Sequence, residues 1–144
     1  LYLALGVLVA LFGVAALHDW RGEAFALRLV PAAVAIGAVF CGVTAVFEGA
    51  FIVFVIYEAV VLLAALALYV GLAATHRRRG AGMVAAGILL NLVAAAVQAS
   101  SVSLTIFVPL DHNGLFHLVQ ILATAVLGFG VVQGMQGAAP APRR

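Results

Sequence analysis

Residues 50–80 read AFIVFVIYEAVVLLAALALYVGLAATHRRRG. The run from 50 to 74 contains a single charged residue, Glu58, and three consecutive arginines follow it at 77–79. A bilayer core about 30 Å thick takes about 20 helical residues to cross. This stretch therefore predicts a membrane-spanning helix that ends at a basic turn.

The composition of the whole chain agrees with this prediction. Hydrophobic residues make up 67% of the 144 residues and charged residues only 8%, whereas soluble domains carry roughly a quarter charged residues. The seven basic and five acidic residues form no long basic stripe, so nucleic acid is not an expected partner. Membrane lipids and other membrane subunits are the expected partners. The single cysteine, Cys41, excludes a Cys-based zinc site within one chain.

Four further apolar runs are long enough to cross a bilayer. The five expected spans are about 1–17, 25–47, 50–74, 83–107 and 114–135. Pro109 favours the end of the fourth helix because proline lacks a backbone donor. We expect an all-α polytopic integral membrane helix bundle. It should form a single domain over 1–137, followed by a Pro/Ala/Arg tail at 138–144.

The first run begins at Leu1 without an initiator Met, so we expect processing or absent N-terminal residues. We interpret this run as a span and not as a signal peptide, because it lacks a basic n-region and a small-x-small cleavage site. All seven basic residues are Arg, and Ala, Gly and Val are abundant. This bias is common in GC-rich bacterial genomes and predicts a bacterial cytoplasmic (inner) membrane.

The arginines also predict the orientation of the spans. If five helices alternate, Arg21 and Arg28 flank the first connection, residues 77–79 lie in the third, and residues 143–144 end the chain. All seven arginines then lie on one side, which is cytoplasmic by the positive-inside rule. We therefore expect the N-terminus outside and the C-terminus in the cytoplasm.

Polar and small residues in three expected helices follow helical spacing, so each set shares one face. The sets are Gly37, Cys41, Thr44 and Glu48 in the second helix; Gly87, Asn91, Ala94, Gln98, Ser101 and Thr105 in the fourth; and Asn113, His117, Gln120 and Thr124 in the fifth. A structural interpretation is that such side chains join helices through hydrogen bonds worth about 0.6 kcal/mol each. We expect a polar bundle face near the outer leaflet, formed by Thr44, Asn91, Gln98, Asn113 and Gln120.

Glu58 and His117 are the candidates for a working site. An ionised carboxylate deep in a membrane costs a few kcal/mol or more, so Glu58 should be protonated, paired or hydrated. His117 is its first candidate partner, and the two would form either a catalytic pair or a structural one. Glu48 and Asp111 are interpreted either as candidate metal ligands or as solvated helix ends.

The stretch DHNGLFHLVQ at 111–120 resembles the last-helix motif of an uncharacterised family of bacterial polytopic membrane proteins. In that family Asn, His and Gln recur in the order of Asn113, His117 and Gln120, and a Gln ends the preceding helix as Gln98 does here. The resemblance covers the C-terminal part of the chain. It implies a polytopic membrane fold and brings no known activity with it.

A more distant resemblance is to the seven-helix hydrolase superfamily of alkaline ceramidases and adiponectin receptors. That superfamily has Ser-x-x-x-His on one helix, an Asp on the next and His-x-x-x-His on the last, with the histidines binding zinc. The corresponding positions here are Thr44-x-x-x-Glu48, then Glu58, then Asn113-x-x-x-His117. Two of the three zinc ligands are replaced. The resemblance implies a zinc site only if Glu48 and His117 gain a third ligand from Asp111 or Glu58.

Three functions are compatible with the sequence. The first, and the one it favours, is a non-catalytic accessory or scaffold subunit of a membrane complex, because the chain is small and hydrogen bonding alone could satisfy its polar set. The second is a metal-assisted membrane lipid hydrolase, with Glu58 and His117 as catalytic residues and Glu48, His117 and Asp111 as metal ligands. The third is proton or small-solute transport through the pair Glu58 and His117.

Overall fold

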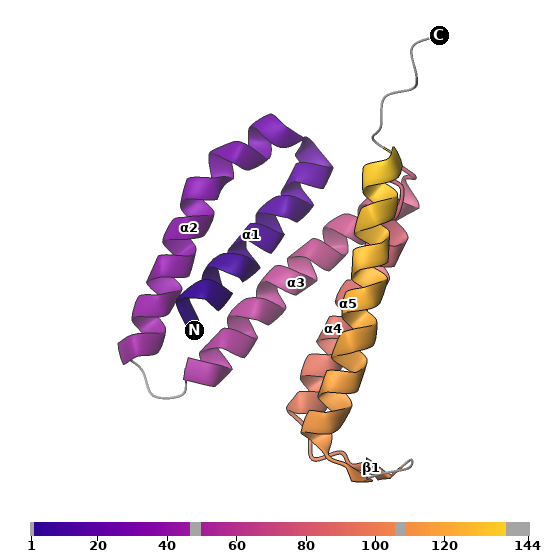
Figure 1. Cartoon of the computed structure of the whole chain (residues 1–144). Coiled ribbons are helices and arrows are strands. Elements are labelled where there is room, and N and C mark those ends of the chain that lie inside the picture. Colours follow the sequence, from indigo (N-terminus) through magenta and orange to yellow (C-terminus); the bar gives the residue numbers. More distant parts are fainter. Residues whose placement is uncertain (1, 47–49, 106–108, 138–144) are drawn as a thin grey trace. The chain divides into compact units, whose positions relative to one another are not determined.

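The computed structural model describes residues 2–46, 50–105 and 109–137 (Figure 1). Within these residues five α-helices follow one another: α1 (Tyr2–Arg21), α2 (Glu23–Val46), α3 (Ala50–Ala74), α4 (Ala81–Gln98) and α5 (His112–Gly137). Two short strands, β1 (Leu104–Thr105) and β2 (Pro109–Leu110), lie between α4 and α5. All five helices are long and apolar enough to cross a membrane. This confirms the predicted all-α polytopic fold.

Contacts group the chain into two compact units, Leu1–Leu68 and Tyr69–Arg144. Unit 1 contains α1, α2 and the first part of α3, and unit 2 contains the last turns of α3, both strands, α4 and α5. Each unit holds one antiparallel helix pair, α1 with α2 and α4 with α5 (Figure 1). The units are described one at a time, so the single bundle over 1–137 stays a prediction. The expected tail at 138–144 lies outside the described residues.

Glycines with positive φ make the turns that join α1 to α2 and α3 to α4. Gly22 has φ +91° and donates its backbone N–H to the carbonyl of His18 at 2.7 Å. Gly80, directly before α4, has φ +76°. Residues with a Cβ rarely adopt this left-handed conformation, which is why glycine so often follows the end of a helix. Gly22 therefore marks the end of α1, whereas Gly80 precedes α4 and the residue with positive φ just after α3 is His76, at +52°.

The fourth helix ends earlier than the sequence predicts. The helix α4 stops at Gln98, so the expected span 83–107 is wrong beyond that residue. The hydroxyl of Ser100 donates to the carbonyl of Val97 at 2.7 Å and accepts the N–H of Val102 at 3.2 Å. A serine that bonds to nearby backbone in this way offers the chain an alternative to the helical ladder. The chain then forms an antiparallel pair in which Leu104 faces Leu110.

Buried side chains in both units are mostly small, whereas large apolar side chains are exposed. Ala16 and Ala33 in unit 1 and Ala94 and Ala123 in unit 2 are at most 4% exposed, but Ile121 is 70% exposed. Lipid tails are as apolar as leucine, so close packing of small residues is a main driving force for helix association in a membrane. This distribution is the one expected of helices surrounded by acyl chains.

Candidate functional site

The candidate site is built on the seam between α4 and α5 in unit 2. Seam residues recur every three or four positions, the spacing that keeps one face of a helix against its partner. They are Val84, Gly87, Asn91 and Ala94 on α4, and Gln120, Ala123, Leu127 and Gly130 on α5.

Two glycines let the backbones of α4 and α5 approach closely. A Cβ on Gly87 would lie 2.7 Å from the backbone nitrogen of Leu127. A Cβ on Gly130 would lie 2.6 Å from the backbone nitrogen of Val84. Real Cβ atoms essentially never come this close to other atoms, so only glycine fits at either position. The approach brings polar side chains on the two helices within hydrogen-bonding distance.

Asn91 and Gln120 form a hydrogen bond across this seam. The Nε2 of Gln120 donates to the Oδ1 of Asn91 at 2.7 Å, and the Nδ2 of Asn91 donates to the carbonyl of Gly87 at 2.9 Å. The Asn91 amide therefore uses its acceptor toward α5 and one donor toward its own helix. Amide side chains in such positions hold membrane helices together.

Gln98, the last residue of α4, has a buried acceptor. Its side chain is half-buried, and its Oε1 has no hydrogen-bond partner among the residues that the structure describes. A buried acceptor without a partner costs about 1–3 kcal/mol. Gln98 is therefore suited to accept a hydrogen bond from a group beyond the described residues.

The residues at the start of α5 play separate local roles. The carboxylate of Asp111 accepts the N–H of Gly114 at 2.8 Å, which makes Asp111 the N-cap of α5. Asn113 is exposed. His117 is also exposed, and its ring contacts the Phe116 ring with centroids 4.9 Å apart. In the described structure only Gln120 of the predicted fifth-helix set lies in the α4–α5 seam.

In the described part of unit 2, the arginines at 77–79 and the acidic residue Asp111 lie at opposite ends of the α4–α5 pair. A Cβ on Gly134 would lie 3.2 Å from the Arg78 guanidinium, so the basic turn lies beside the last turns of α5. Cations are favourable near the C-terminus of a helix. Gln98 and Asp111 lie at the far end of the same helix pair, about 27 Å away along α4 at 1.5 Å per residue.

Glu58 lies in unit 1 beside an aromatic cluster. Its neighbour Tyr57 donates its hydroxyl to the carbonyl of Gly6 on α1 at 2.9 Å, and the Tyr57 ring stacks on Phe40 of α2 with centroids 4.9 Å apart. The ring of Phe54 also contacts that of Phe40, with centroids 6.0 Å apart. The carboxyl of Glu58 is half-buried and forms no hydrogen bond or ion pair with another described residue. Tyr57, rather than Glu58, is thus the polar residue that joins α3 to α1.

The proposed groupings of acids and histidine stay predictions. Glu58 belongs to unit 1 and His117 to unit 2, and the two units are described separately. Glu48 lies outside the described residues. Among residues 2–46, 50–105 and 109–137, no three His, Cys, Asp or Glu side chains are grouped closely enough to hold a metal ion. Thr44 donates its hydroxyl to the carbonyl of Cys41 in its own helix at 3.0 Å.

Sequence reasoning missed the α5 side of the seam. The expected set on α5 was chosen by polarity and included His117 and Thr124, both of which are exposed. The observed seam continues from Gln120 through Ala123, Leu127 and Gly130, most of which are apolar. The repeat of small residues, read together with Gly130-x-x-x-Gly134, was the signal that could have located it.

Comparison with known proteins assigns the chain to a family that has no known activity. A family model described as a family of unknown function (DUF6962) matches residues 1–136. This range includes α1 to α4 and nearly all of α5. No curated protein and no solved structure matches the chain significantly. The resemblance to alkaline ceramidases and adiponectin receptors therefore stays a prediction.

Proposed function

The chain belongs to this family of unknown function, and we propose that it is a non-catalytic accessory or scaffold subunit of a membrane complex. The observation that carries the proposal is the hydrogen bond from Gln120 to Asn91. It places two of the most polar side chains of α4 and α5 in a structural role. Asp111 likewise serves as a helix cap, and Tyr57 as a link between α3 and α1.

The outer face of α5 supports an interaction role in the membrane. Leu118, Ile121, Leu122 and Phe129 are each more than half exposed. Such a face can contact acyl chains or the apolar face of another membrane subunit. Because the described helices are joined by short connections, most of the surface that the chain offers to a partner belongs to its membrane-spanning helices.

Native purification tests the proposal directly. The tagged full-length chain would be extracted in a mild detergent, sized by light scattering, and its co-purifying proteins identified by mass spectrometry. We expect a complex larger than the monomer that contains a second membrane protein at a fixed ratio. A monomer with no co-purifying protein would contradict the proposal, and an unrelated tagged polytopic protein serves as the control.

Substitution of His117 distinguishes the scaffold proposal from the hydrolase alternative. Because His117 is exposed and its ring contacts that of Phe116, its neighbour in the chain, His117→Ala should change the free energy of unfolding by less than about 0.5 kcal/mol. Metal content should stay well below one ion per chain in both proteins. His112→Ala, at the first residue of the same helix, is the matched control. One metal ion per wild-type chain, lost in His117→Ala only, would instead support a metal-assisted lipid hydrolase.

We also propose a bacterial cytoplasmic membrane with the arginines facing the cytosol. The support is the exclusive use of Arg among basic residues and the position of the 77–79 turn beside the end of α5. In a Cys41→Ala background, Asn113→Cys should react with an impermeant maleimide on intact cells, and Thr75→Cys only after permeabilisation. Equal labelling of both positions from outside would contradict this orientation.

A further inference from the structure

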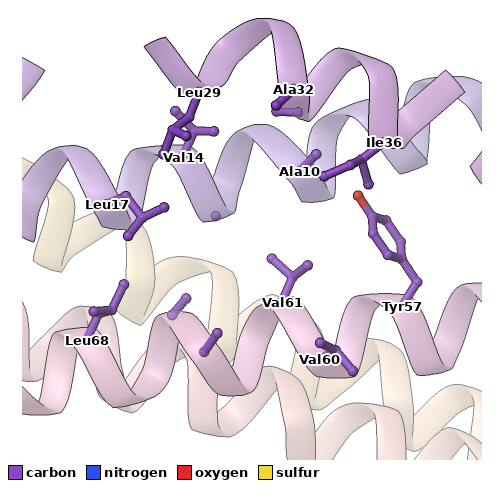
Figure 2. A pocket seen from close by; sticks show the side chains of 14 residues that line it. Ala10, Val14, Leu17, Leu29, Ala32, Ile36, Tyr57, Val60, Val61 and Leu68 are labelled. Carbon is purple, nitrogen blue, oxygen red and sulfur yellow. The ribbon is translucent and has the colours of Figure 1, made fainter. Parts of the chain in front are cut away.

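Unit 1 has an open cavity of about 380 Å³ between α1, α2 and α3 (Figure 2). Its lining side chains lie between Ala10 and Leu17 on α1, between Leu29 and Ile36 on α2, and between Tyr57 and Leu68 on α3. The volume falls within the range of about 300–1,000 Å³ that is usual for small-molecule sites. The cavity is therefore large enough to hold a ligand.

Gly13 of α1 lies close to Val61 of α3 along the cavity, and aromatic contacts hold α3 near α1 and α2 at one end. There the hydroxyl of Tyr57 bonds to the carbonyl of Gly6 and its ring stacks on Phe40. Further along α3, the lining residues are small or branched, such as Val61 and Ala64. Figure 2 shows the space between these side chains and those of α1 and α2. The small residues leave space that the larger aromatic rings fill at the other end.

The apolar lining of the cavity favours a hydrocarbon ligand. Every lining residue is apolar except Tyr57, and the Tyr57 hydroxyl already donates to Gly6. A buried water needs two to four polar partners, and apolar cavities of this kind stay dry. In a bilayer the surrounding hydrocarbon is lipid, so an acyl chain is the available occupant.

The length of the cavity matches one acyl chain from one leaflet. From Tyr57 to Leu68 the helix rises about 16 Å at 1.5 Å per residue. A single leaflet contributes about half of a hydrocarbon core about 30 Å thick. Figure 2 places Leu17 opposite Leu68 at one end and Tyr57 near Ile36 at the other. The Leu17 end lies toward the turn between α1 and α2, and the Tyr57 end lies past the middle of α3, at the level of Gly6 on α1.

Arg28 is the basic residue next to the cavity lining in the sequence of α2. Arg28 directly precedes the lining residue Leu29, is exposed, and has no ion pair among the described residues. The nearby Asp19 contacts His18 at 3.2 Å, and Arg21 lies over the Phe25 ring at 5.8 Å. A guanidinium binds phosphate through two parallel hydrogen bonds. Glu23 is the other acid of this turn, five residues from Arg28.

We propose that unit 1 binds one anionic phospholipid, with an acyl chain in the α1–α2–α3 cavity and the phosphate on Arg28. The bound lipid belongs to the leaflet on the side of the α1–α2 turn. It fills space that the side chains leave open and so stabilises the position of α3 against the hairpin. The proposal does not depend on the accessory role, because a lipid site of this kind requires no second protein.

Retained lipid is the first measurement. The full chain would be reconstituted in nanodiscs with equal phosphatidylglycerol and phosphatidylcholine, then extracted in mild detergent, and its phospholipid counted by mass spectrometry. We expect about one phosphatidylglycerol per chain. Ala64→Phe, which fills the cavity, should lower this ratio several-fold. Ala67→Phe, an exposed alanine of the same helix that does not line the cavity, should leave it unchanged.

Arg28→Gln tests the headgroup contact separately. It should keep one lipid per chain but lower the preference for phosphatidylglycerol about fivefold, the effect of about one arginine near an anionic surface. Unchanged preference would overturn the assignment of Arg28. Retention of an isoprenoid lipid without phosphate, in place of phosphatidylglycerol, would overturn the phospholipid assignment.

A probe on the wild-type chain keeps the proposal testable if Ala64→Phe fails to fold. Phosphatidylglycerol with a diazirine in its acyl chain would be photolysed in the nanodisc, and labelled residues located by mass spectrometry. Labels should concentrate on lining residues such as Val61 and Leu68 in preference to the exposed Leu63. Labelling spread evenly over the exposed faces, with no retained lipid, would overturn the proposal.

Discussion

The two units use the same kind of apolar helix but pack it differently. In unit 2, α4 and α5 touch along a repeated seam, with Gly87 against Leu127 and Gly130 against Val84. In unit 1, α1 and α2 are equally close, because a Cβ on Gly37 would lie 2.9 Å from the backbone nitrogen of Val7. The helix α3, however, is held to this pair through larger side chains, and a cavity of about 380 Å³ lies beside them.

The difference shows what closes a helix seam in a membrane. Apolar side chains gain little by leaving lipid for one another, so van der Waals contact and interhelical hydrogen bonds decide the packing. Glycine repeated at helical spacing gives contact along the whole length of α4 and α5. In unit 1 an aromatic cluster around Tyr57 and the approach of Gly13 to Val61 hold α3 to the α1–α2 pair. The first arrangement suits a rigid support, and the second leaves a site for a lipid chain.

The largest expected effect comes from opening the α4–α5 seam. Gly87→Leu would place a side chain where even a Cβ lies 2.7 Å from the Leu127 backbone. Overpacking of this kind costs about 3 kcal/mol when the neighbouring atoms are backbone and cannot move aside. We expect a large drop in the thermal midpoint of the detergent-solubilised protein, measured by circular dichroism.

Gly128→Leu is the matched control for that substitution. Gly128 is an exposed glycine of α5, and a Cβ there meets nothing within 4 Å. Leucine also has a higher helix propensity than glycine, so this variant should be neutral or slightly stabilised. Equal destabilisation by both variants would show that the seam is not what holds α4 and α5 together.

A smaller effect is expected at the start of α5. Asp111→Ala removes the side chain that accepts the N–H of Gly114 at 2.8 Å, and loss of such a cap costs about 1 kcal/mol. Asp111→Asn keeps a capping oxygen and should retain most of the stability. If Asp111→Asn were as damaging as Asp111→Ala, the negative charge itself would matter, as a metal-ligand role predicts. Thermal unfolding of the three proteins in one detergent makes the comparison.

The helices could be predicted from sequence, and so could the segregation of charge within unit 2. An apolar run with a single charged residue, such as 50–74, has only one low-energy conformation in lipid, because its backbone must bond to itself. The α3 bounds agree with the prediction for this reason. The end of α4 did not follow from hydropathy, since Val102 and Leu104 are as apolar as a helix requires. The hydroxyl of Ser100 decided it.

The site could be predicted only in part, because polarity alone does not fix which way a helix is rotated. Asn91 and Gln120 were both expected on a polar face, and the structure brings these two together. His117 and Gln120 are three residues apart, yet His117 is exposed while Gln120 faces α4. The rotation follows from where small residues allow contact, at Ala123 and Gly130. The cavity in unit 1 was not predictable, since it depends on how the side chains of three helices pack together.

The smallest expected effect is the coupling between Asn91 and Gln120. Gln120→Leu leaves the Oδ1 of Asn91 without the donor it has at 2.7 Å, and Asn91→Leu leaves the Gln120 amide without its acceptor. Replacing both should cost less than the sum of the two single changes, by a coupling of about 0.6 kcal/mol. In a double-mutant cycle between Gln120 and the exposed Asn113, the two changes in unfolding free energy should add, because these side chains share no contact. Additivity for Asn91 and Gln120 would mean that shape alone closes the seam, and the structural role assigned to its polar residues would fail.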